Sequence, residues 1–276
     1  MTGPTGPIGV FDSGVGGLTV VSALLRRYPT ADLLYVADQA HVPYGGRPLT
    51  EVRSFATGIT RALVAWGCRA VVMACNISSA TALADCRSEF PDLPVTGVLG
   101  PAVEAALRAA GGQAAPRIGV LATEGTVATG AYPAMLNSAC RGALVTQVAC
   151  PDLVPLIENG LKDPELVRRR CSEYLRPMSS AGCSAIVLGC THYPLALDCL
   201  RAAASGLFQA VPAFVDPSDA IVDELEGLIP LGAGSATVRL LTTGDPGRFE
   251  AQAGVWLGGR RFVVGSAQWQ GSDLRR

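Results

Sequence analysis

Lysine is nearly absent from this sequence, which limits the chemistry that the chain can perform. Of the 22 Lys and Arg residues only Lys162 is a lysine, and it lies in the polar stretch "NGLKDPE". A pyridoxal phosphate enzyme needs a lysine for its Schiff base, and a P-loop needs one directly after its glycines. The sequence therefore disfavours both a pyridoxal phosphate enzyme and a P-loop protein.

Paired cysteines of the kind that form disulfides or bind metals are also lacking. The nine cysteines are an odd number and are scattered without a CxxC pair, and there are only two histidines. A disulfide framework or a zinc site has a different spacing. We therefore expect a reduced, cytoplasmic protein without a metal site.

The sequence also lacks long apolar runs and an excess of one charge. No apolar run reaches the roughly 18 residues of a membrane span, and the first residues lack a basic start followed by an apolar signal core. The net charge of −1 provides no basic field for nucleic acid or anionic lipid. The basic cluster at 168–170 is interpreted as a solvated helix face. We expect neither a membrane nor a nucleic acid as partner.

What is present is an apolar chain with alternating short and long segments. Hydrophobic residues make up 49% of its 276 residues, which suits one large or two ordinary domains. Periodicity at helical spacing predicts helices over 49–67 and 164–182. Continuously apolar runs, typical of parallel strands buried on both faces, predict strands over 7–12, 33–38, 70–75, 94–99, 117–123, 144–150, 185–190 and 213–216. The pattern indicates an α/β fold.

The two halves of the chain resemble each other. An "IGV" strand and a small-residue turn begin at Ile8 and again at Ile118, and each half later has an aliphatic strand that ends in a cysteine, Cys75 or Cys190. This repeat predicts two similar α/β domains related by an approximate two-fold axis. Since ligands of such sheets bind beyond the carboxyl ends of the strands, we expect the two cysteines to converge on one cleft between the domains.

The turn "FDSGVGG" allows two interpretations. Its glycines let the backbone approach a ligand, and the following helix start would present free N–H groups to an anion. Alternatively, it is a tight strand-to-helix turn capped by Asp12 or Ser13.

Two of the nine cysteines stand out by position. Cys75 and Cys190 each end a strand and are followed by groups that bind anions or orient a thiol, so we expect a catalytic role for both. The remaining thiols are interpreted as small buried hydrophobes, namely Cys68, Cys86, Cys140, Cys150, Cys171, Cys183 and Cys199.

Four further features of the sequence have both a functional and a structural interpretation. His192, two residues beyond Cys190, either assists proton transfer or is a structural histidine. His41 is interpreted as a loop residue in preference to a functional one. "PYGG" (43–46) either lends backbone N–H groups to a carboxylate or is a plain turn. Glu158 is either an acid near the cleft or the polar end of a helix.

Seven motifs taken together resemble those of bacterial glutamate racemase, from about residue 8 to about residue 265 and in the order of that family. They are "GVFDSGVGGLTV", "YVADQAHVPYGGRP", "ACNISSATAL", "GVLATEGTVATGAY", "PLIENG", "LGCTHYPLA" and "TTGDPGRF". The resemblance implies interconversion of L- and D-glutamate without cofactor or metal, and supply of D-glutamate for peptidoglycan. It implies two flavodoxin-like domains with mainly parallel sheets and the active site between them. We expect residues 1–98 with 211–276 to form the first domain, and 99–210 the second.

The resemblance also implies residue roles. Cys75 would remove the proton from D-glutamate, assisted by Asp12, and Cys190 would remove it from L-glutamate, assisted by His192 and Glu158. The positions that match substrate-binding residues of the family are Asp12, Ser13, Pro43, Tyr44, Gly45, Asn76, Ile77, Thr191 and His192. Dimers are common in that family, which makes a homodimer compatible with this chain.

Racemisation itself explains a duplicated thiol. A proton leaves one face of Cα and another returns to the opposite face, which one side chain does not easily serve alone. A free thiol is only a few per cent thiolate at neutral pH, and hydrogen-bond donors and helix N-termini increase that fraction.

One residue departs from the family pattern. The family usually has Thr or Ser after Cys-Asn, and Ile77 keeps the backbone N–H of that position but lacks the hydroxyl. One lost hydrogen bond to a charged group costs on the order of 1.5–3 kcal/mol. Ser78 is a candidate replacement for the hydroxyl.

Three other functions remain open at this point. A related two-cysteine racemase would act on aspartate or a hydantoin, although the aspartate type usually has Glu where His192 stands. A catalytically weakened binding homologue is the alternative that Ile77 suggests. A dinucleotide- or flavin-binding protein fits the fold pattern but lacks the GxGxxG fingerprint.

Overall fold

The computed structural model describes residues 6–231 and 234–276. The chain divides into two compact units, unit 1 with the residues up to Val98 and Ser218–Arg276, and unit 2 with Leu99–Pro217. The sequence predicted a return to the first domain after residue 210. This boundary is corrected to Pro217, because the strand Ala213–Val215 pairs with the sheet of unit 2.

Unit 1 contains a six-stranded parallel sheet in the order β10-β9-β2-β1-β3-β4 and a separate two-stranded hairpin, β11-β12. Its strands are β1 Ile8–Asp12, β2 Leu33–Ala37, β3 Ala70–Met73, β4 Val95–Gly97, β9 Val238–Thr242, β10 Val263–Ser266, β11 Gln268–Gln270 and β12 Asp273–Arg275. Its helices are α1 Leu18–Arg27, α2 Leu49–Ala65, α3 Asn76–Glu89, α10 Pro217–Leu228 and α11 Pro246–Leu257, with 3-10 turns η1 Gln39–His41 and η2 Tyr44–Gly46.

Helices cover both faces of this sheet. Leu34 and Val36 of β2 belong to a core cluster with Ile59 and Leu63 of α2. Successive side chains of a strand point to opposite faces, so Tyr35 points the other way, where its ring stacks 6.3 Å from Phe249 of α11. Burial on both faces explains why the strands are continuously apolar.

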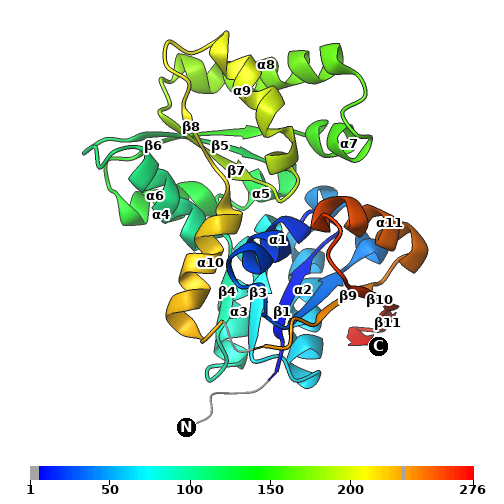
Figure 1. Cartoon of the computed structure of the whole chain (residues 1–276). Helices are drawn as coiled ribbons and strands as arrows, with labels where there is room; N and C mark the ends of the chain where they lie inside the picture. Colours follow the sequence, from blue (N-terminus) through cyan, green and yellow to red (C-terminus); the bar gives the residue numbers. More distant parts are fainter. Residues whose placement is uncertain (1–5, 232–233) are drawn as a thin grey trace. The chain divides into compact units, whose positions relative to one another are not determined.

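Unit 2 is built around a four-stranded parallel sheet in the order β6-β5-β7-β8. Figure 1 shows this sheet with α8 and α9 on one side and α4 and α6 on the other. Its strands are β5 Arg117–Ala122, β6 Leu144–Ala149, β7 Ala185–Gly189 and β8 Ala213–Val215. Its helices are α4 Leu99–Ala109, α5 Glu124–Ala128, α6 Ala131–Ala139, α7 Leu153–Glu158, α8 Pro164–Ser180 and α9 Leu197–Ser205, with a 3-10 turn η3 Tyr193–Ala196.

The internal repeat is visible in the strand order. The order β2-β1-β3-β4 in unit 1 matches β6-β5-β7-β8 in unit 2, and both follow the 2-1-3-4 order of flavodoxin-like sheets. The predicted α/β fold with mainly parallel sheets is confirmed. The eight predicted strands are all present, and β9 to β12 are additional strands that the sequence patterns did not indicate.

Local sequence signals start several helices. Asp163 caps α8 by accepting a hydrogen bond from the backbone N–H of Leu166, and Pro164 occupies the first helical position. Asp245 and Pro246 repeat this arrangement at the start of α11. Capping residues and prolines therefore set these helix starts within the sequence itself.

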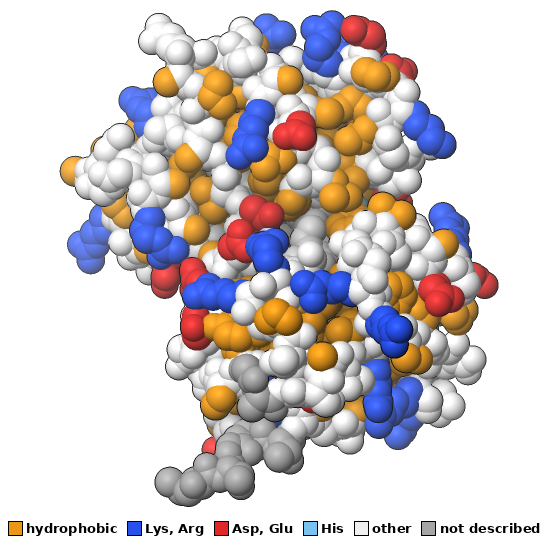
Figure 2. Space-filling view, in the orientation of Figure 1, with side chains coloured by type: hydrophobic (Ala, Val, Ile, Leu, Met, Phe, Trp, Pro, Cys, Tyr) orange, Lys and Arg blue, Asp and Glu red, His pale blue; other side chains and the backbone are white. Residues whose placement is uncertain are grey.

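The basic cluster at 168–170 lies on α8 and is paired with acids. Arg168 contacts Glu165 at 2.7 Å, and Arg170 contacts Glu173 at 2.8 Å. On the face drawn in Figure 2, Lys and Arg side chains are interspersed with acidic and uncharged ones. Within the described residues, no helix combines the length and apolar character needed to cross a membrane.

Candidate active site

Three neighbouring strands of unit 1 end side by side, and each has a polar side chain at its end or just beyond it. The backbone N–H of Asp38, after β2, donates to the carbonyl of Asp12 at the end of β1 over 3.0 Å. On the other side of β1, the N–H of Ala74 donates to the carbonyl of Phe11 over 2.9 Å, which places Cys75 beyond β3. The carboxyl edge of this sheet thus presents two carboxyl groups and a thiol.

The turn after β1 is the tight turn held by Asp12 that the sequence offered as one of two interpretations. The buried Asp12 carboxylate accepts hydrogen bonds from the backbone N–H of Gly14 (3.3 Å) and of Gly17 (3.0 Å), which precedes α1. A Cβ on Gly17 would lie 2.6 Å from Cβ of Asp12 and 2.8 Å from Oη of Tyr35. Only glycine therefore lets α1 start this close to Asp12.

A buried tyrosine lies beneath the same turn. The hydroxyl of Tyr35 donates to the carbonyl of Gly14 over 2.6 Å. Burial raises the pKa of Tyr35 well above its usual value, and negative charge on Asp12 and Cys75 raises it further. The phenol therefore stays protonated and keeps donating to the turn.

The thiol of Cys75 stands at the start of a long helix. Cys75 is the N-cap of α3 and is 6% exposed, and Asn76 follows as the first helical residue, also buried. A helix N-terminus presents free backbone N–H groups, which stabilise negative charge. One turn later, the hydroxyl of Ser79 donates to the carbonyl of Met73 over 2.8 Å and holds α3 against β3.

Ile77 packs into an apolar cluster. It is 3% exposed and shares this cluster with Tyr44, Val52 and Cys75. The neighbouring Ser78 is fully buried, and its hydroxyl has no hydrogen-bond partner among the described residues. Ile77 is thus an apolar neighbour of the thiol at the position where the sequence lacks the hydroxyl usual in the family that it resembles.

The "PYGG" segment forms a turn that borders this thiol. Tyr44 is buried and donates from its hydroxyl to Oδ2 of Asp38 over 2.6 Å, whereas Pro43 is exposed and Gly45 is half-buried. His41 is not a plain loop residue, because its Nδ1 lies 2.8 Å from the same oxygen of Asp38. Asp38 is the residue that the sequence analysis missed, although its position directly after an apolar strand was a signal for it.

In unit 2 the second thiol has a histidine and a carboxylate in series. Cys190 follows β7 and is 8% exposed, and its Sγ lies 3.8 Å from Nδ1 of His192. Nε2 of His192 lies 3.3 Å from Oε1 of Glu158, whose side chain is 49% exposed. Glu158 is also the last residue of α7, as the interpretation of a polar helix end predicted. This series can pass a proton or stabilise a charged ring beside the thiol.

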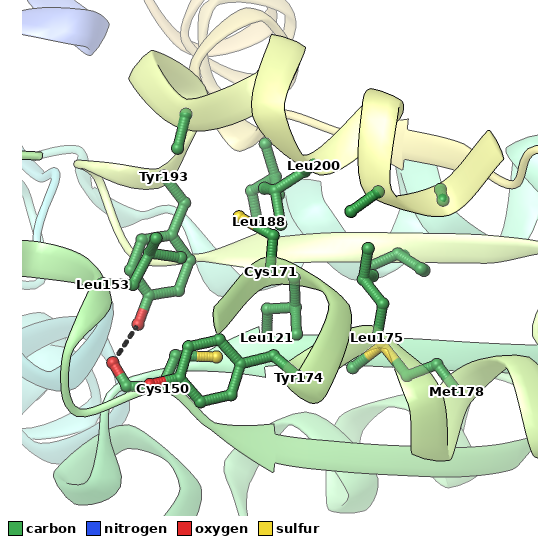
Figure 3. Close-up of a cluster of buried hydrophobic side chains, with 14 of the residues drawn as sticks. Leu121, Cys150, Leu153, Cys171, Tyr174, Leu175, Met178, Leu188, Tyr193 and Leu200 are labelled. Carbon is green, nitrogen blue, oxygen red and sulfur yellow. Dashed lines mark hydrogen bonds between the residues drawn. The ribbon is translucent and has the colours of Figure 1, made fainter. Parts of the chain in front are cut away.

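A buried tyrosine fixes the turn that follows Cys190. Tyr193 donates from its hydroxyl to the carbonyl of Cys150 over 3.3 Å, the bond drawn dashed in Figure 3, and its ring belongs to the main core of unit 2. Its backbone N–H donates to the carbonyl of Cys190 over 3.1 Å. Thr191 is half-buried between the thiol and His192. The core thus sets the position of the Cys190–His192 turn.

The structure divides the predicted site residues between the two units. Asp12, Ser13, Pro43, Tyr44, Gly45, Cys75, Asn76 and Ile77 belong to unit 1, and Glu158, Cys190, Thr191 and His192 belong to unit 2. Among the other cysteines, Cys140 and Cys199 are half-buried and the rest are buried. Within the described residues, no group of three or more His, Cys, Asp or Glu side chains is arranged to hold a metal ion.

Known proteins resemble this chain over most of its length. Residues 12–225 match the model of the Asp/Glu/hydantoin racemase family. A glutamate racemase of Roseiflexus sp. is 41% identical over 88% of this chain and 89% of its own. The crystal structure of glutamate racemase isoform RacE1 from Bacillus anthracis has a TM-score of 0.87 at 32% identity, covering 95% of this chain and 97% of its own. The glutamate racemase from Francisella tularensis, solved in complex with D-glutamate, has a TM-score of 0.82 at 26% identity, covering 94% and 96%. The chain belongs to the Asp/Glu/hydantoin racemase family.

Proposed function

We propose that this protein is a glutamate racemase that moves the α-proton with two thiols, Cys75 and Cys190, and without a cofactor. The observation that carries the proposal is the repeat of a thiol at the carboxyl end of topologically equivalent strands, β3 and β7. A racemase needs one acid/base group for each face of Cα. Its substrate and product are mirror images of equal energy, which a duplicated half-site suits.

The two half-sites support their thiols differently. Cys75 stands at the N-terminus of α3, after the strand that neighbours the strand of the buried Asp12, whereas Cys190 contacts the imidazole of His192. In the proposed mechanism Cys75 removes the proton from D-glutamate and the protonated Cys190 delivers one to the opposite face. The reverse reaction starts at Cys190. His192 and Glu158 assist the proton transfers of Cys190, and Asp12 assists those of Cys75.

The substrate carboxylates would be held by backbone and side-chain donors. We assign this binding to Ser13, Pro43, Tyr44, Gly45, Asn76, Ile77, Thr191 and His192, together with Asp12. The support is their match to family motifs and, for those in unit 1, their place at one edge of its sheet. Donors directed at the α-carboxylate would stabilise the charge that develops when Cα is deprotonated.

We place the reaction in the cytoplasm, where D-glutamate would enter peptidoglycan synthesis, and we propose a homodimer as the form in solution. All nine cysteines are free thiols, which supports a reducing compartment. Size-exclusion chromatography with light scattering tests the dimer.

The first experiment incubates the purified protein with L- or D-glutamate in D₂O without cofactor and follows circular dichroism and α-proton exchange. The wild type is expected to bring optical activity to zero. Cys75→Ser and Cys190→Ser are expected to lose racemisation, and any remaining exchange should occur from the L-isomer in the first variant and from the D-isomer in the second. The reverse pattern would contradict the facial assignment.

Two controls complete this experiment. Cys68→Ala removes a buried thiol of unit 1 that lies outside the proposed site, and Cys183→Ala does the same in unit 2. Both variants are expected to racemise glutamate like the wild type. Turnover of aspartate or a hydantoin but not of glutamate would reassign the substrate. Absence of both racemisation and exchange on all three would overturn the proposed function.

A further inference from the structure

The carboxyl group of Asp38 lies at the centre of four hydrogen bonds. It is fully buried directly after β2. Its Oδ1 accepts from Oγ1 of Thr243 and from Nε1 of Trp269, each over 2.8 Å. Its Oδ2 accepts from Oη of Tyr44 over 2.6 Å and contacts Nδ1 of His41 over 2.8 Å. Three segments that lie far apart in the sequence, residues 38–44, Thr243 and Trp269, therefore meet at one side chain.

Aromatic rings enclose this group. The His41 ring stacks on Phe55 with centroids 3.8 Å apart and planes within 8°, and it meets Trp269 edge-on at 5.3 Å. Tyr44 and Phe55 lie 5.8 Å apart. A buried carboxyl group that loses one donor pays a large desolvation cost, so the four partners are strongly held together.

One of the four partners connects Asp38 to the proposed active site. Tyr44 is 2% exposed and packs in the same apolar cluster as Cys75 and Ile77. Burial raises the pKa of Tyr44 well above its usual value, and the neighbouring Asp38 raises it further. The phenol of Tyr44 therefore remains a hydrogen-bond donor to Asp38. This bond holds the Tyr44 ring in the cluster that contains Cys75.

We propose that Asp38 is a positioning residue that holds the substrate-binding turn, residues 41–46, beside Cys75, and that Trp269 of the β11-β12 hairpin supports this role by its hydrogen bond to Asp38. The inference rests on the proposed function, since Tyr44 and Gly45 are assigned to substrate binding there. Asp38 does not touch the reacting atoms. It acts through Tyr44 and His41, so its loss displaces the turn and weakens substrate binding more than it slows the chemical step.

Asp32 offers a matched control at the other end of β2. It precedes β2 at the opposite end of the sheet and also accepts several hydrogen bonds, from the backbone N–H groups of Ser235 (3.0 Å) and Thr237 (2.8 Å). Asp38→Asn and Asp32→Asn thus make the same chemical change. Trp269→Phe removes one donor and keeps an aromatic ring, and Trp66→Phe is its control in the same unit.

The kinetic test measures kcat and KM on both isomers of glutamate. Asp38→Asn is expected to raise KM roughly ten- to a hundredfold, the effect of one lost hydrogen bond to a charged group, with a much smaller change in kcat. Trp269→Phe should raise KM less, and Asp32→Asn and Trp66→Phe should leave KM unchanged. Equal KM values in Asp38→Asn and Asp32→Asn would overturn the proposal.

A double-mutant cycle tests whether Asp38 acts through Tyr44. Tyr44→Phe removes the hydroxyl and keeps the ring. If the inference is right, the increase in KM caused by Tyr44→Phe should largely vanish in the Asp38→Asn background, but persist in the Asp32→Asn background. Effects that multiply in both backgrounds would show that the two residues act independently and would contradict the inference.

Hydrogen exchange of the protein without substrate separates this inference from the proposed function. Peptides covering residues 39–47 are expected to exchange faster in Asp38→Asn than in the wild type and in Asp32→Asn. An unchanged rate would overturn the positioning role. If the wild type does not act on glutamate but Asp38→Asn loosens only this segment, the proposed function fails while the positioning of the turn stands.

Discussion

Sγ of Cys190 and Nδ1 of His192 lie 3.8 Å apart, and the opposite nitrogen of the ring lies 3.3 Å from Glu158. The corresponding thiol of unit 1 instead stands at the N-terminus of a 14-residue helix. Two topologically equivalent strands thus end in the same reactive group with different electrostatic support. Since the two isomers have equal energy, substitutions around Cys190 should lower kcat/KM equally in both directions, but should suppress α-proton exchange more from L-glutamate, the isomer that Cys190 is proposed to deprotonate.

His192→Asn is expected to lower kcat, and with it kcat/KM equally for both isomers, by about 10²–10⁴-fold, the usual contribution of an acid/base group. The physical reason is that the proposed function has this imidazole, 3.8 Å from Sγ of Cys190, assist the proton transfers of that thiol. Initial rates in both directions, measured by circular dichroism, check this. An unchanged kcat would mean that the ring only packs beside the thiol.

Glu158→Gln should have a much smaller effect than His192→Asn. The Glu158 side chain is 49% exposed, and solvent-exposed ion pairs contribute about 0–1 kcal/mol, or less than about sixfold in rate. The comparison is made at low and high ionic strength, since screening should remove the difference between Glu158→Gln and the wild type. A loss as large as that of His192→Asn would make Glu158 an essential part of the proton transfer.

Ile77→Thr is expected to raise kcat/KM on glutamate, up to the roughly ten- to hundredfold effect of one hydrogen bond to a charged group. The same change should lower the free energy of unfolding by about 1 kcal/mol, because Ile77 is buried in an apolar cluster with Cys75. Kinetics and urea denaturation check the two effects separately.

Ile77→Val is the matched control for that substitution, because it has nearly the volume of Thr without its hydroxyl. It should share the loss of stability and show no gain in kcat/KM. Unchanged or lower efficiency in Ile77→Thr would count against a missing hydroxyl at this position.

Gly17→Ala should destabilise the protein by about 1–3 kcal/mol and reduce activity, since the added Cβ would overlap Cβ of Asp12 and Oη of Tyr35. Thermal unfolding and the racemisation assay measure these effects. Gly254→Ala in α11, where a Cβ would have no neighbour within 4 Å, should instead be neutral or stabilising. Equal behaviour of the two variants would contradict the close approach at Asp12.

The free energy of unfolding is expected to fall as the pH rises above about 8.5, the pKa of an unfolded cysteine. Burial raises the pKa of Cys68 and of Cys171 to about 12 in the folded protein. These thiols ionise first in the unfolded chain, so their contribution is present below pH 8.5 or so and is lost as the pH rises toward 12. Urea denaturation between pH 7 and 10 should show a shallower decline for Cys68→Ala and for Cys171→Ala than for the wild type. Cys140→Ala, at a half-buried position, serves as the control.

Much of the fold could be read from local patterns. The strands of the repeat are continuously apolar because helices cover both faces of their sheets, and that burial leaves a direct trace in the sequence. The strands β9 to β12 escaped prediction. Two of the five residues of β9 are exposed or only partly buried and alternate with buried ones, and the hairpin strands are only three residues long. Short, half-exposed strands carry little apolar signal.

The candidate site divides in the same way. Sequence placed Cys75, Cys190 and Asp12 at strand ends and His192 beside its thiol, because these relations span few residues. The partnership of Asp38 with Trp269 joins residues 231 positions apart, and no local pattern contains it. The side on which Ile77 packs also depended on the position of α2 and Tyr44.

By itself the sequence determined the α/β class, the repeat and the location of the thiols, since apolar periodicity, glycine turns and helix caps act through neighbouring residues. Only the tertiary structure decided the strand order, the return of the chain at Pro217 and the contacts of Asp38 with the distant residues Thr243 and Trp269. The reason is physical: hydrogen bonds to a buried carboxyl group and side-chain packing depend on which segments meet in space, and that is settled when the sheets and helices assemble.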